Sequence, residues 1–286
     1  TRLRSAPRPL RVSYAGQVAR VRGDQLRPER QFTQVGAEML GSDTVRADAE
    51  IVAMTAAALA EAGIAELSVD LTVPRLAELV IAGQGYNGTE AAEIRAALDG
   101  KDAGRLQELV GDNAVLSGLL NAAGTADLAI QRLQALGLAG DAGQMINRLA
   151  ETVTAIRQEV PDLALTIDPA EYRGFEYQSG VSFAIFARNV RGELGRGGRY
   201  TTETGETSVG VSLYMDSILR ALDAGDAPTR IFAPLDVPSD VIATARRDGK
   251  VICRALDDAG HADAEARRQG CSDILMPDGT VRPLQD

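Results

Sequence analysis

Histidine and cysteine are scarce in this chain of 286 residues. The only histidine, His261, lies in the polar stretch DDAGHADAEARR, where we expect an exposed loop residue. A single histidine excludes a zinc site built from several histidines and leaves no spare one for a Ser-His-Asp triad. The two cysteines, Cys253 and Cys271, are too few for a disulfide framework and lack C-x-x-C spacing, so we expect reduced thiols. Neither a metal nor a cofactor is expected.

Long apolar runs are also missing. No stretch approaches the roughly 18 unbroken apolar residues that a membrane span needs. The opening TRLRSAPRPLRVSY has basic residues without the apolar stretch of a secretion signal. We therefore expect a cytoplasmic protein. With 45% hydrophobic residues, the chain can bury one large core or two modest ones.

Positive charge is in the minority, because 30 basic residues face 40 acidic ones and leave a net charge of −10. Such a chain repels phosphate backbones unless its basic residues are segregated. Arginines do concentrate near the N-terminus, in TRLRSAPRPLR and VRGDQLRPERQ. Two interpretations stay open for them, a solvated edge of the domain or part of an anion or substrate site.

Alternating apolar and polar residues predict a long antiparallel hairpin from residues 8–20 and 30–40. Helical spacing follows over 42–63, with Ser42 or Asp43 as the N-cap. Segments rich in Val, Ile and Phe predict further strands. These are residues 64–72, 163–169, 179–190 and 207–215.

Residues 74–158 have a different texture, with Ala- and Leu-rich segments punctuated by glycine, which is typical of short helices joined by Gly turns. After Pro228 the pattern of strand, helix, strand, helix, strand predicts a small α/β unit that closes in a hairpin at Asp278-Gly279. The predicted fold class is α+β, an antiparallel sheet flanked by helices. Its predicted parts are a core of residues 1–73 and 159–227, a helical insertion of 74–158 and the α/β unit of 228–286.

Polar side chains on the predicted strands mark a candidate pocket. They are Gln34, Glu38, Arg173, Glu176 and Arg199. A buried charge persists only when it is paired or bound. Two interpretations stay open, a pocket lining, or Glu38 and either Arg20 or Arg173 satisfying each other inside the sheet. The glycines of GELGRGGRY could let a ligand approach the backbone closely, although Gly-Gly between strands is more often a turn.

The stretches YAGQVAR…RQFTQVGAEMLG and RGFEYQSG…GGRY occur in one order within residues 8–222. The first resembles motif 2 of class II aminoacyl-tRNA synthetases in its histidyl form. The second resembles the two histidine-binding motifs of histidyl-tRNA synthetase. The resemblance implies the class II fold, a mainly antiparallel sheet flanked by helices that is often dimeric.

The resemblance implies that a histidine pocket is retained. Its residues are Gln34, Glu38, Arg173, Glu176, Gln178 and Tyr200. By position, Gln34 and Glu38 match residues that hold the histidine substrate, and Arg173 matches the arginine that faces its carboxylate and the phosphate. Tyr200 closes the GGRY end of the pocket. Gln178 replaces a pocket tyrosine, because the family's RGLDYY has become RGFEYQ.

The resemblance also marks a vestigial ATP site. Arg20 matches the motif 2 arginine that grips the ATP α-phosphate, but Arg22 stands where a synthetase has a glutamate, which reverses the charge. In motif 3, Asp216 and Ser217 stand where the family has Glu-Arg, so the arginine for the γ-phosphate is missing. Each lost charge-assisted phosphate contact costs roughly 1.5 to 3 kcal/mol. Several together leave little adenylation catalysis.

A histidyl-tRNA synthetase body without ATP chemistry resembles the regulatory subunit family of ATP phosphoribosyltransferase. This second resemblance implies a protein with no catalytic residues. It implies an allosteric subunit that forms homodimers and a hetero-oligomer with the short-form catalytic subunit, activates that subunit, and confers feedback inhibition by histidine in the first step of histidine biosynthesis. No tRNA partner is expected. The alternatives are a divergent ATP-dependent ligase of the histidyl-tRNA synthetase type and a structural paralogue with neither ligand nor catalyst as partner.

Overall fold

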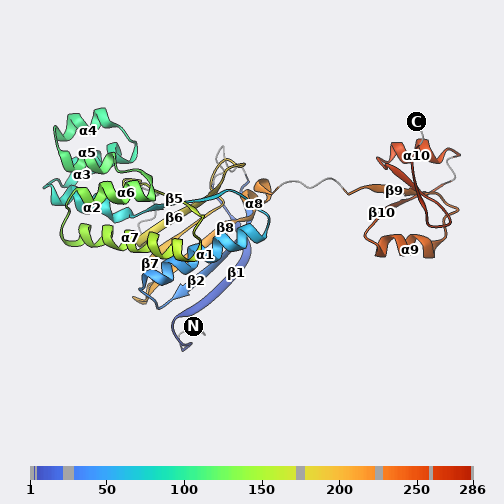
Figure 1. Cartoon of the computed structure of the whole chain (residues 1–286), viewed down its shortest axis with the longest axis horizontal. Helices are drawn as coiled ribbons and strands as arrows, with labels where there is room; N and C mark the ends of the chain where they lie inside the picture. Colours follow the sequence, from blue (N-terminus) through green and yellow to red (C-terminus); the bar gives the residue numbers. More distant parts are fainter. Residues whose placement is uncertain are drawn as a thin grey trace. The chain divides into compact units, whose positions relative to one another are not determined.

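The computed structural model divides the chain into two compact units, Thr1–Leu222 and Asp223–Asp286. Each unit is described by itself (Figure 1). The structure describes residues 3, 5–21, 29–171, 178–222, 228–257 and 260–284. Among these residues, no helix combines the length and the apolarity that crossing a bilayer requires.

A sheet of eight strands forms the centre of the first unit. The strands are β1 (Leu10–Ala19), β2 (Gln31–Leu40), β3 (Leu67–Thr72), β4 (Gly124–Thr125), β5 (Ala164–Ile167), β6 (Gln178–Ala187), β7 (Gly195–Thr201) and β8 (Thr207–Tyr214). Their order is β1-β2-β8-β7-β6-β3-β5-β4, and every neighbouring pair is antiparallel except β3 with β5. The prediction of an α+β fold with a mainly antiparallel sheet from both halves of the chain is confirmed. So is the hairpin of β1 and β2, in which Leu10 pairs with Leu40.

Helix α1 (Val45–Glu61) begins later than the sequence predicts. Its N-cap is Thr44, whose side chain accepts a hydrogen bond from the backbone N–H of Ala47 at 3.2 Å. The predicted caps, Ser42 and Asp43, are engaged elsewhere. The Ser42 hydroxyl lies 3.1 Å from the hydroxyl of Thr44, and the Asp43 carboxylate pairs with Arg148. Any of the three residues suits a cap, so tertiary contacts decided among them.

The sequence favours a turn at the Gly-Gly pair of GELGRGGRY, but in the structure both glycines belong to a strand. Gly197 and Gly198 lie in β7, between β6 and β8. A Cβ atom on Gly197 would overlap the ring of Phe183, and one on Gly198 would lie 2.7 Å from the Cβ atom of Ser182. Glycine is required at both positions because atoms of Phe183 and Ser182 on β6 occupy the space that a side chain would need.

The segment between β3 and β5 folds into six helices. They are α2 (Pro74–Gly83), α3 (Gly88–Asp99), α4 (Ala103–Val110), α5 (Ala114–Leu120), α6 (Ala126–Ala135) and α7 (Gly140–Glu159). Helix α7 packs along α1, and α2 packs against β6 (Figure 1). One hydrophobic cluster joins buried residues of these helices, such as Leu106 and Leu133, to sheet residues such as Leu71 and Phe183. Because the core is shared, the division into a synthetase-like core and an insertion stays a prediction.

The second unit has its own four-stranded sheet. Its elements are β9 (Arg230–Ala233), α9 (Ser239–Arg247), β10 (Val251–Arg254), α10 (Ala262–Arg268), β11 (Asp273–Leu275) and β12 (Val281–Pro283). The order is β10-β9-β11-β12, with β12 antiparallel to β11 and the other pairs parallel. The predicted element order and the Asp278-Gly279 hairpin are confirmed, since Gly279 has a φ of +86°. His261 is exposed at the start of α10, as predicted.

Candidate functional site

A pocket of about 330 Å³ lies over strands β2, β6, β7 and β8. Three glycines and a group of polar side chains line it. They include Gly197, Gly198, Gly210, Gln34, Glu38, Gln178 and Tyr200. Four of the six residues predicted for the histidine pocket therefore lie together. The other two, Arg173 and Glu176, fall outside the described residues.

Glu38, on β2, is the half-buried carboxylate of this pocket. Its Oε2 atom accepts a hydrogen bond from the hydroxyl of Tyr200 at 2.9 Å. Burial raises the pKa of the Glu38 carboxyl above its ordinary value, against the effect of the Tyr200 hydroxyl. A Cβ atom on Gly210, opposite Glu38 on β8, would overlap the carboxylate. Among the described residues no cation pairs with Glu38, so its charge faces a pocket that a cationic ligand group can enter.

Gln34 is held in place by two hydroxyl groups that the sequence analysis did not single out. Its Nε2 atom donates to the Tyr14 hydroxyl at 2.9 Å and to the Ser212 hydroxyl at 3.0 Å. The same two hydroxyls lie 2.7 Å from each other. These bonds use the nitrogen of the amide, and within the described part of the chain no donor contacts its oxygen, which can therefore accept a hydrogen bond from a ligand. The pairing of β1 with β2 and of β2 with β8 brings these side chains together, and no local sequence motif predicts that.

Gln178 contributes a buried acceptor. Its side chain is buried, and its Nε2 atom donates to the backbone oxygen of Gly197 at 3.3 Å. Its Oε1 atom is buried and has no hydrogen-bond partner within the described part of the chain. A buried polar atom without a partner costs about 1 to 3 kcal/mol. A ligand N–H group in the pocket would remove that cost.

Arg20 and Asp216, two residues of the predicted ATP site, form an ion pair, although Arg20 Nη2 and Asp216 Oδ1 have no hydrogen-bond partner among the described residues. The Nη1 atom of Arg20 lies 3.2 Å from Asp216 Oδ2 and donates to the backbone oxygen of Glu29 at 3.0 Å. The guanidinium carbon of Arg20 lies 3.8 Å from the ring centroid of Phe32, a cation-π distance. Asp216 therefore competes with a phosphate for the charge of Arg20. The interpretation that Arg20 pairs with Glu38 is therefore wrong, and the possible pairing of Glu38 with Arg173 lies outside the described residues, as does Arg22.

Ser217, on α8 (Met215–Ala221), stands at the position predicted for a missing phosphate-binding arginine. Its side chain is buried, and its hydroxyl accepts a hydrogen bond from Arg220 Nη2 at 3.2 Å. A buried hydroxyl carries no charge with which to bind a phosphate. The assignment of these positions to a vestigial ATP site stays a prediction.

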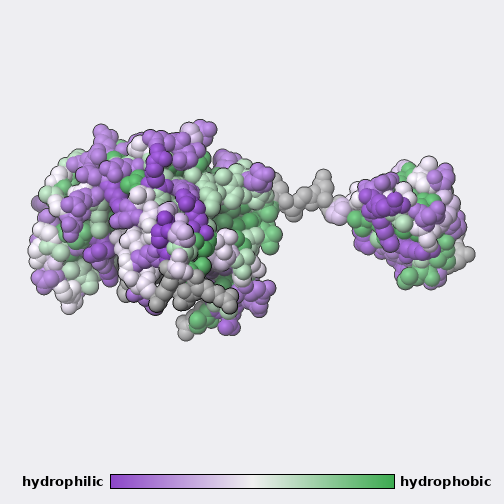
Figure 2. All heavy atoms as spheres, turned by 90° about the horizontal axis from the view of Figure 1, so that it is seen from below, coloured by the Kyte–Doolittle hydropathy of each residue, from purple (hydrophilic) through white to green (hydrophobic). Residues whose placement is uncertain are grey.

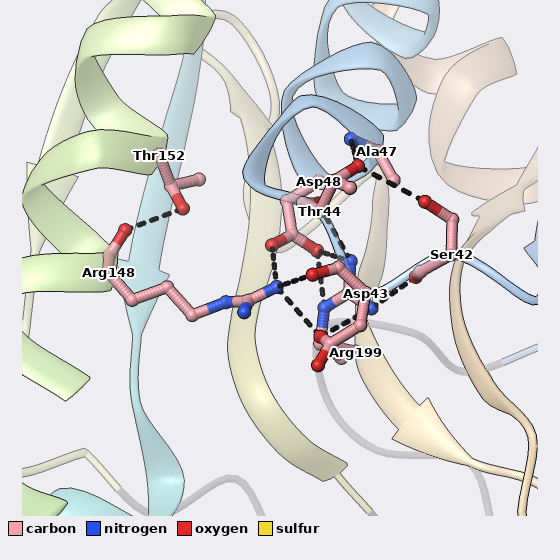
Figure 3. A network of polar contacts seen from close by, with 8 residues as sticks. All are labelled: Ser42, Asp43, Thr44, Ala47, Asp48, Arg148, Thr152 and Arg199. Carbon is pink, nitrogen blue, oxygen red and sulfur yellow. Dashed lines mark hydrogen bonds and ion pairs between the residues drawn. The ribbon is translucent and has the colours of Figure 1, made fainter. Parts of the chain in front are cut away.

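Arg199 does not line the pocket, in contrast to the prediction. Neighbouring residues of a strand point to opposite faces, so Tyr200 lies at the pocket and Arg199 lies on the side of α1. There its Nη2 atom pairs with Asp48 Oδ1 at 2.6 Å, and its Nη1 atom donates to the backbone oxygen of Ser42 at 2.7 Å (Figure 3). Arg148 of α7 pairs with the other oxygen of Asp48 at 3.3 Å. Arg199, Asp48 and Arg148 together therefore link β7, α1 and α7.

Comparison with known proteins identifies the family. A family model of histidyl-tRNA synthetase matches residues 1–218. An ATP phosphoribosyltransferase regulatory subunit from Paramagnetospirillum magneticum is 48% identical, over 98% of this chain and 74% of the relative. One from Rhodospirillum centenum is 44% identical, over 100% of this chain and 74% of the relative. The chain belongs to the ATP phosphoribosyltransferase regulatory subunit family.

Solved structures agree with this family in their fold. A structure from Bacillus halodurans, described as an ATP phosphoribosyltransferase regulatory subunit/histidyl-tRNA synthetase, aligns with a TM-score of 0.76 at 24% identity, over 96% of this chain and 75% of that one. The ATP phosphoribosyl transferase (HisG:HisZ) complex from Thermotoga maritima aligns with a TM-score of 0.62 at 18% identity, over 75% and 76% of the two chains. The predicted class II synthetase-like fold is confirmed. As a member of this family, the chain is a regulatory subunit and not the catalytic one.

Proposed function

We propose that the chain binds the short-form catalytic subunit of an ATP phosphoribosyltransferase and activates it, and that it makes the complex sensitive to feedback inhibition by histidine. The observation that carries this proposal is a contrast between two neighbouring sites. The pocket around Glu38 keeps polar groups that face a ligand-sized cavity, whereas the candidate ATP-binding arginine, Arg20, is neutralised by Asp216. A chain with this combination binds an amino acid without activating it.

The chemistry of the pocket suits histidine. Free histidine carries a carboxylate, an ammonium group and an imidazole ring, so a selective site needs one cation and several acceptors. Glu38 supplies a carboxylate, and Gln178 supplies a buried oxygen that lacks a donor. A volume of about 330 Å³ lies at the small end of the range for ligand pockets, which suits a single amino acid. In this proposal Gln34, Glu176 and Tyr200 complete the site, and Arg173 is the cation for the histidine carboxylate.

The proposal includes further partners and a location. Figure 2 shows apolar side chains gathered on the first unit near α8. Leu219 of α8 is 66% exposed. Exposed apolar patches typically mark protein contacts. We therefore propose this surface as a contact for a second copy of the chain or for the catalytic subunit. The proposal also places the protein in the cytoplasm and includes no tRNA partner.

The decisive experiment mixes the chain with a short-form ATP phosphoribosyltransferase. We expect comigration on gel filtration, a higher turnover than the catalytic subunit shows alone, and inhibition when histidine is added. A ligand shifts an equilibrium only through its different affinities for two states. A variant without histidine binding should therefore still activate the catalytic subunit. Unchanged kinetics together with separate migration would contradict the proposal.

The alternative function, a divergent ligase that adenylates an amino acid, uses the same pocket but needs a bound ATP. The contact of Arg20 with Asp216 argues against it, because the carboxylate of Asp216 offsets the positive charge that would attract a phosphate. Histidine-dependent exchange of pyrophosphate into ATP would favour the ligase.

A further inference from the structure

Tyr14, Gly36 and Ser212 lie side by side on three neighbouring strands of the first unit. Tyr14 of β1 pairs with Gly36 of β2, and Gly36 pairs with Ser212 of β8. A Cβ atom on Gly36 would overlap the ring and the hydroxyl group of Tyr14. Because Gly36 has no side chain, the Tyr14 ring lies across β2, and its hydroxyl oxygen reaches the Ser212 hydroxyl oxygen at 2.7 Å. Tyr14 thereby contacts a residue that lines the pocket around Glu38.

Gln34 closes a triangle of hydrogen-bonding atoms with these two hydroxyls. Its amide lies 2.9 Å from the oxygen of Tyr14 and 3.0 Å from the oxygen of Ser212. Three contacts need three hydrogen atoms, and the two hydroxyls carry only two. If the amide presented its oxygen, one contact would bring two acceptors together without a hydrogen atom. The amide must therefore present its nitrogen to the hydroxyls, and the triangle fixes the direction in which Gln34 is turned.

Both hydroxyls are needed to fix this direction. A single hydroxyl donates to an amide oxygen as readily as it accepts from an amide nitrogen. With Tyr14 or Ser212 alone, the Gln34 amide would be satisfied in either orientation. With both, the oxygen is the end that remains for a ligand, and within the described part of the chain no donor contacts it. Gln34, which lines the pocket, therefore meets a ligand as an acceptor only.

We propose that Tyr14 and Ser212 are positioning residues that determine the ligand specificity of this pocket, because they hold Gln34 as an acceptor. The pocket then favours a ligand whose nitrogen donates a hydrogen bond to Gln34. It rejects a ligand that places an acceptor there, since an amide that cannot turn leaves two acceptors facing each other. This role of Tyr14 and Ser212 rests on the proposed binding of histidine in the same pocket.

The test measures affinities by calorimetric titration of the full chain with histidine and three analogues. Two analogues are alanines that carry an oxazole ring, attached through C4 or through C5, in place of the imidazole. The third is imidazole pyruvate, which has a carbonyl oxygen in place of the ammonium group. Neither oxazole has an N–H group, so the three analogues place an acceptor at every nitrogen position of histidine.

Variants of the two hydroxyl residues should relax the specificity. In Tyr14→Phe the amide can turn its nitrogen toward an acceptor. For at least one analogue, the ratio of the affinity for histidine to the affinity for the analogue should therefore fall by about tenfold. Ser212→Ala should give the same fall, and the double variant should add little, because either substitution alone opens the triangle. Adding Gln34→Glu to Tyr14→Phe should restore the rejection, because a carboxylate presents an oxygen at both ends.

Ser13→Ala, at an exposed residue next to Tyr14 on β1, is the control and should leave every ratio unchanged. Circular dichroism checks the fold of each variant. If the unmodified chain binds histidine but no variant changes any ratio, the role of Tyr14 and Ser212 is overturned and the proposed function stands. Additive effects of Tyr14→Phe and Ser212→Ala would also overturn this role, since the two hydroxyls would then not act through one amide. An unmodified chain that does not bind histidine would overturn the proposed function as well.

Discussion

Glu38 has the two features that a ligand-binding carboxylate needs, a fixed position and an unpaired charge. The Tyr200 hydroxyl fixes its orientation, and no cation among the described residues neutralises it. Because one charge-assisted hydrogen bond is worth roughly 1.5 to 3 kcal/mol, Glu38→Gln should weaken histidine inhibition of the complex by about 10- to 100-fold. Activation without histidine should remain. Glu61→Gln, at an exposed glutamate of α1, is the matched control. Superimposable inhibition curves for Glu38→Gln and the unmodified protein would place the histidine site elsewhere.

The raised pKa of Glu38 predicts how histidine binding depends on pH. Because burial raises this pKa above the ordinary value of 4.5, the carboxyl takes up its proton at a higher pH than an exposed glutamate does. A cationic group of the ligand needs the ionised form. Histidine affinity should therefore be full above the raised pKa and fall as the pH drops through it.

Calorimetric titration across pH measures this effect. The imidazole of free histidine titrates near 6.5 and affects every variant equally. The difference between the profiles of the unmodified protein and Glu38→Gln therefore isolates Glu38. Parallel profiles would exclude Glu38 as a contact of the cation.

Gly210 provides the space that the Glu38 carboxylate occupies. A methyl group at this position would overlap the carboxylate, so Gly210→Ala should move Glu38 and abolish most of the histidine inhibition. Overpacking of this kind costs about 1 to 3 kcal/mol of stability. Gly16→Ala is the control, because a Cβ atom there meets nothing within 4 Å. If both variants bind histidine equally well by calorimetry, the Glu38 carboxylate does not contact the ligand.

At the scale of elements, the network around Asp48 joins β7, α1 and α7 through two arginines (Figure 3). The side chains of Arg199 and Asp48 are only 3% and 4% exposed. Removing one member of a buried ion pair costs about 3 to 5 kcal/mol, because the other charge stays buried without its partner. Arg199→Met should therefore destabilise the first unit strongly in denaturant unfolding. Asp48→Leu combined with Arg199→Met should restore much of the loss.

A surface pair provides the comparison for this network. Arg188 and Glu66 form an ion pair with exposures of 80% and 62%, so Arg188→Met should change stability by less than about 1 kcal/mol. If the Arg199 and Asp48 substitutions were additive, the two side chains would not act as a pair.

At the scale of the whole molecule, the contrast between the pocket around Glu38 and the candidate ATP site at Arg20 predicts that the protein does not adenylate histidine. Arg20 is engaged by Asp216, and Ser217 carries no charge for a phosphate. We expect no histidine-dependent pyrophosphate exchange above background with the full chain. A histidyl-tRNA synthetase assayed in parallel shows that the assay works. Exchange in both proteins would replace the regulatory proposal with the ligase.

Much of the fold follows from local patterns in the sequence. The hairpin, the strands from both halves and the element order of the second unit are visible as apolar spacing, because strands and helices bury alternate or 3.6-spaced residues. Motif resemblance also brought Gln34, Glu38, Gln178 and Tyr200 into one predicted pocket, since a shared fold fixes which strands lie side by side.

Tertiary structure alone decided the contacts between residues far apart in the chain. Arg20 meets a partner 196 residues away, and Arg199 faces α1 although its neighbour Tyr200 faces the pocket. Such contacts depend on the register and order of strands, and a slip of one residue would turn every side chain of a strand to the opposite face. Local sequence determines which residues are buried, and the assembled sheet determines what each of them meets.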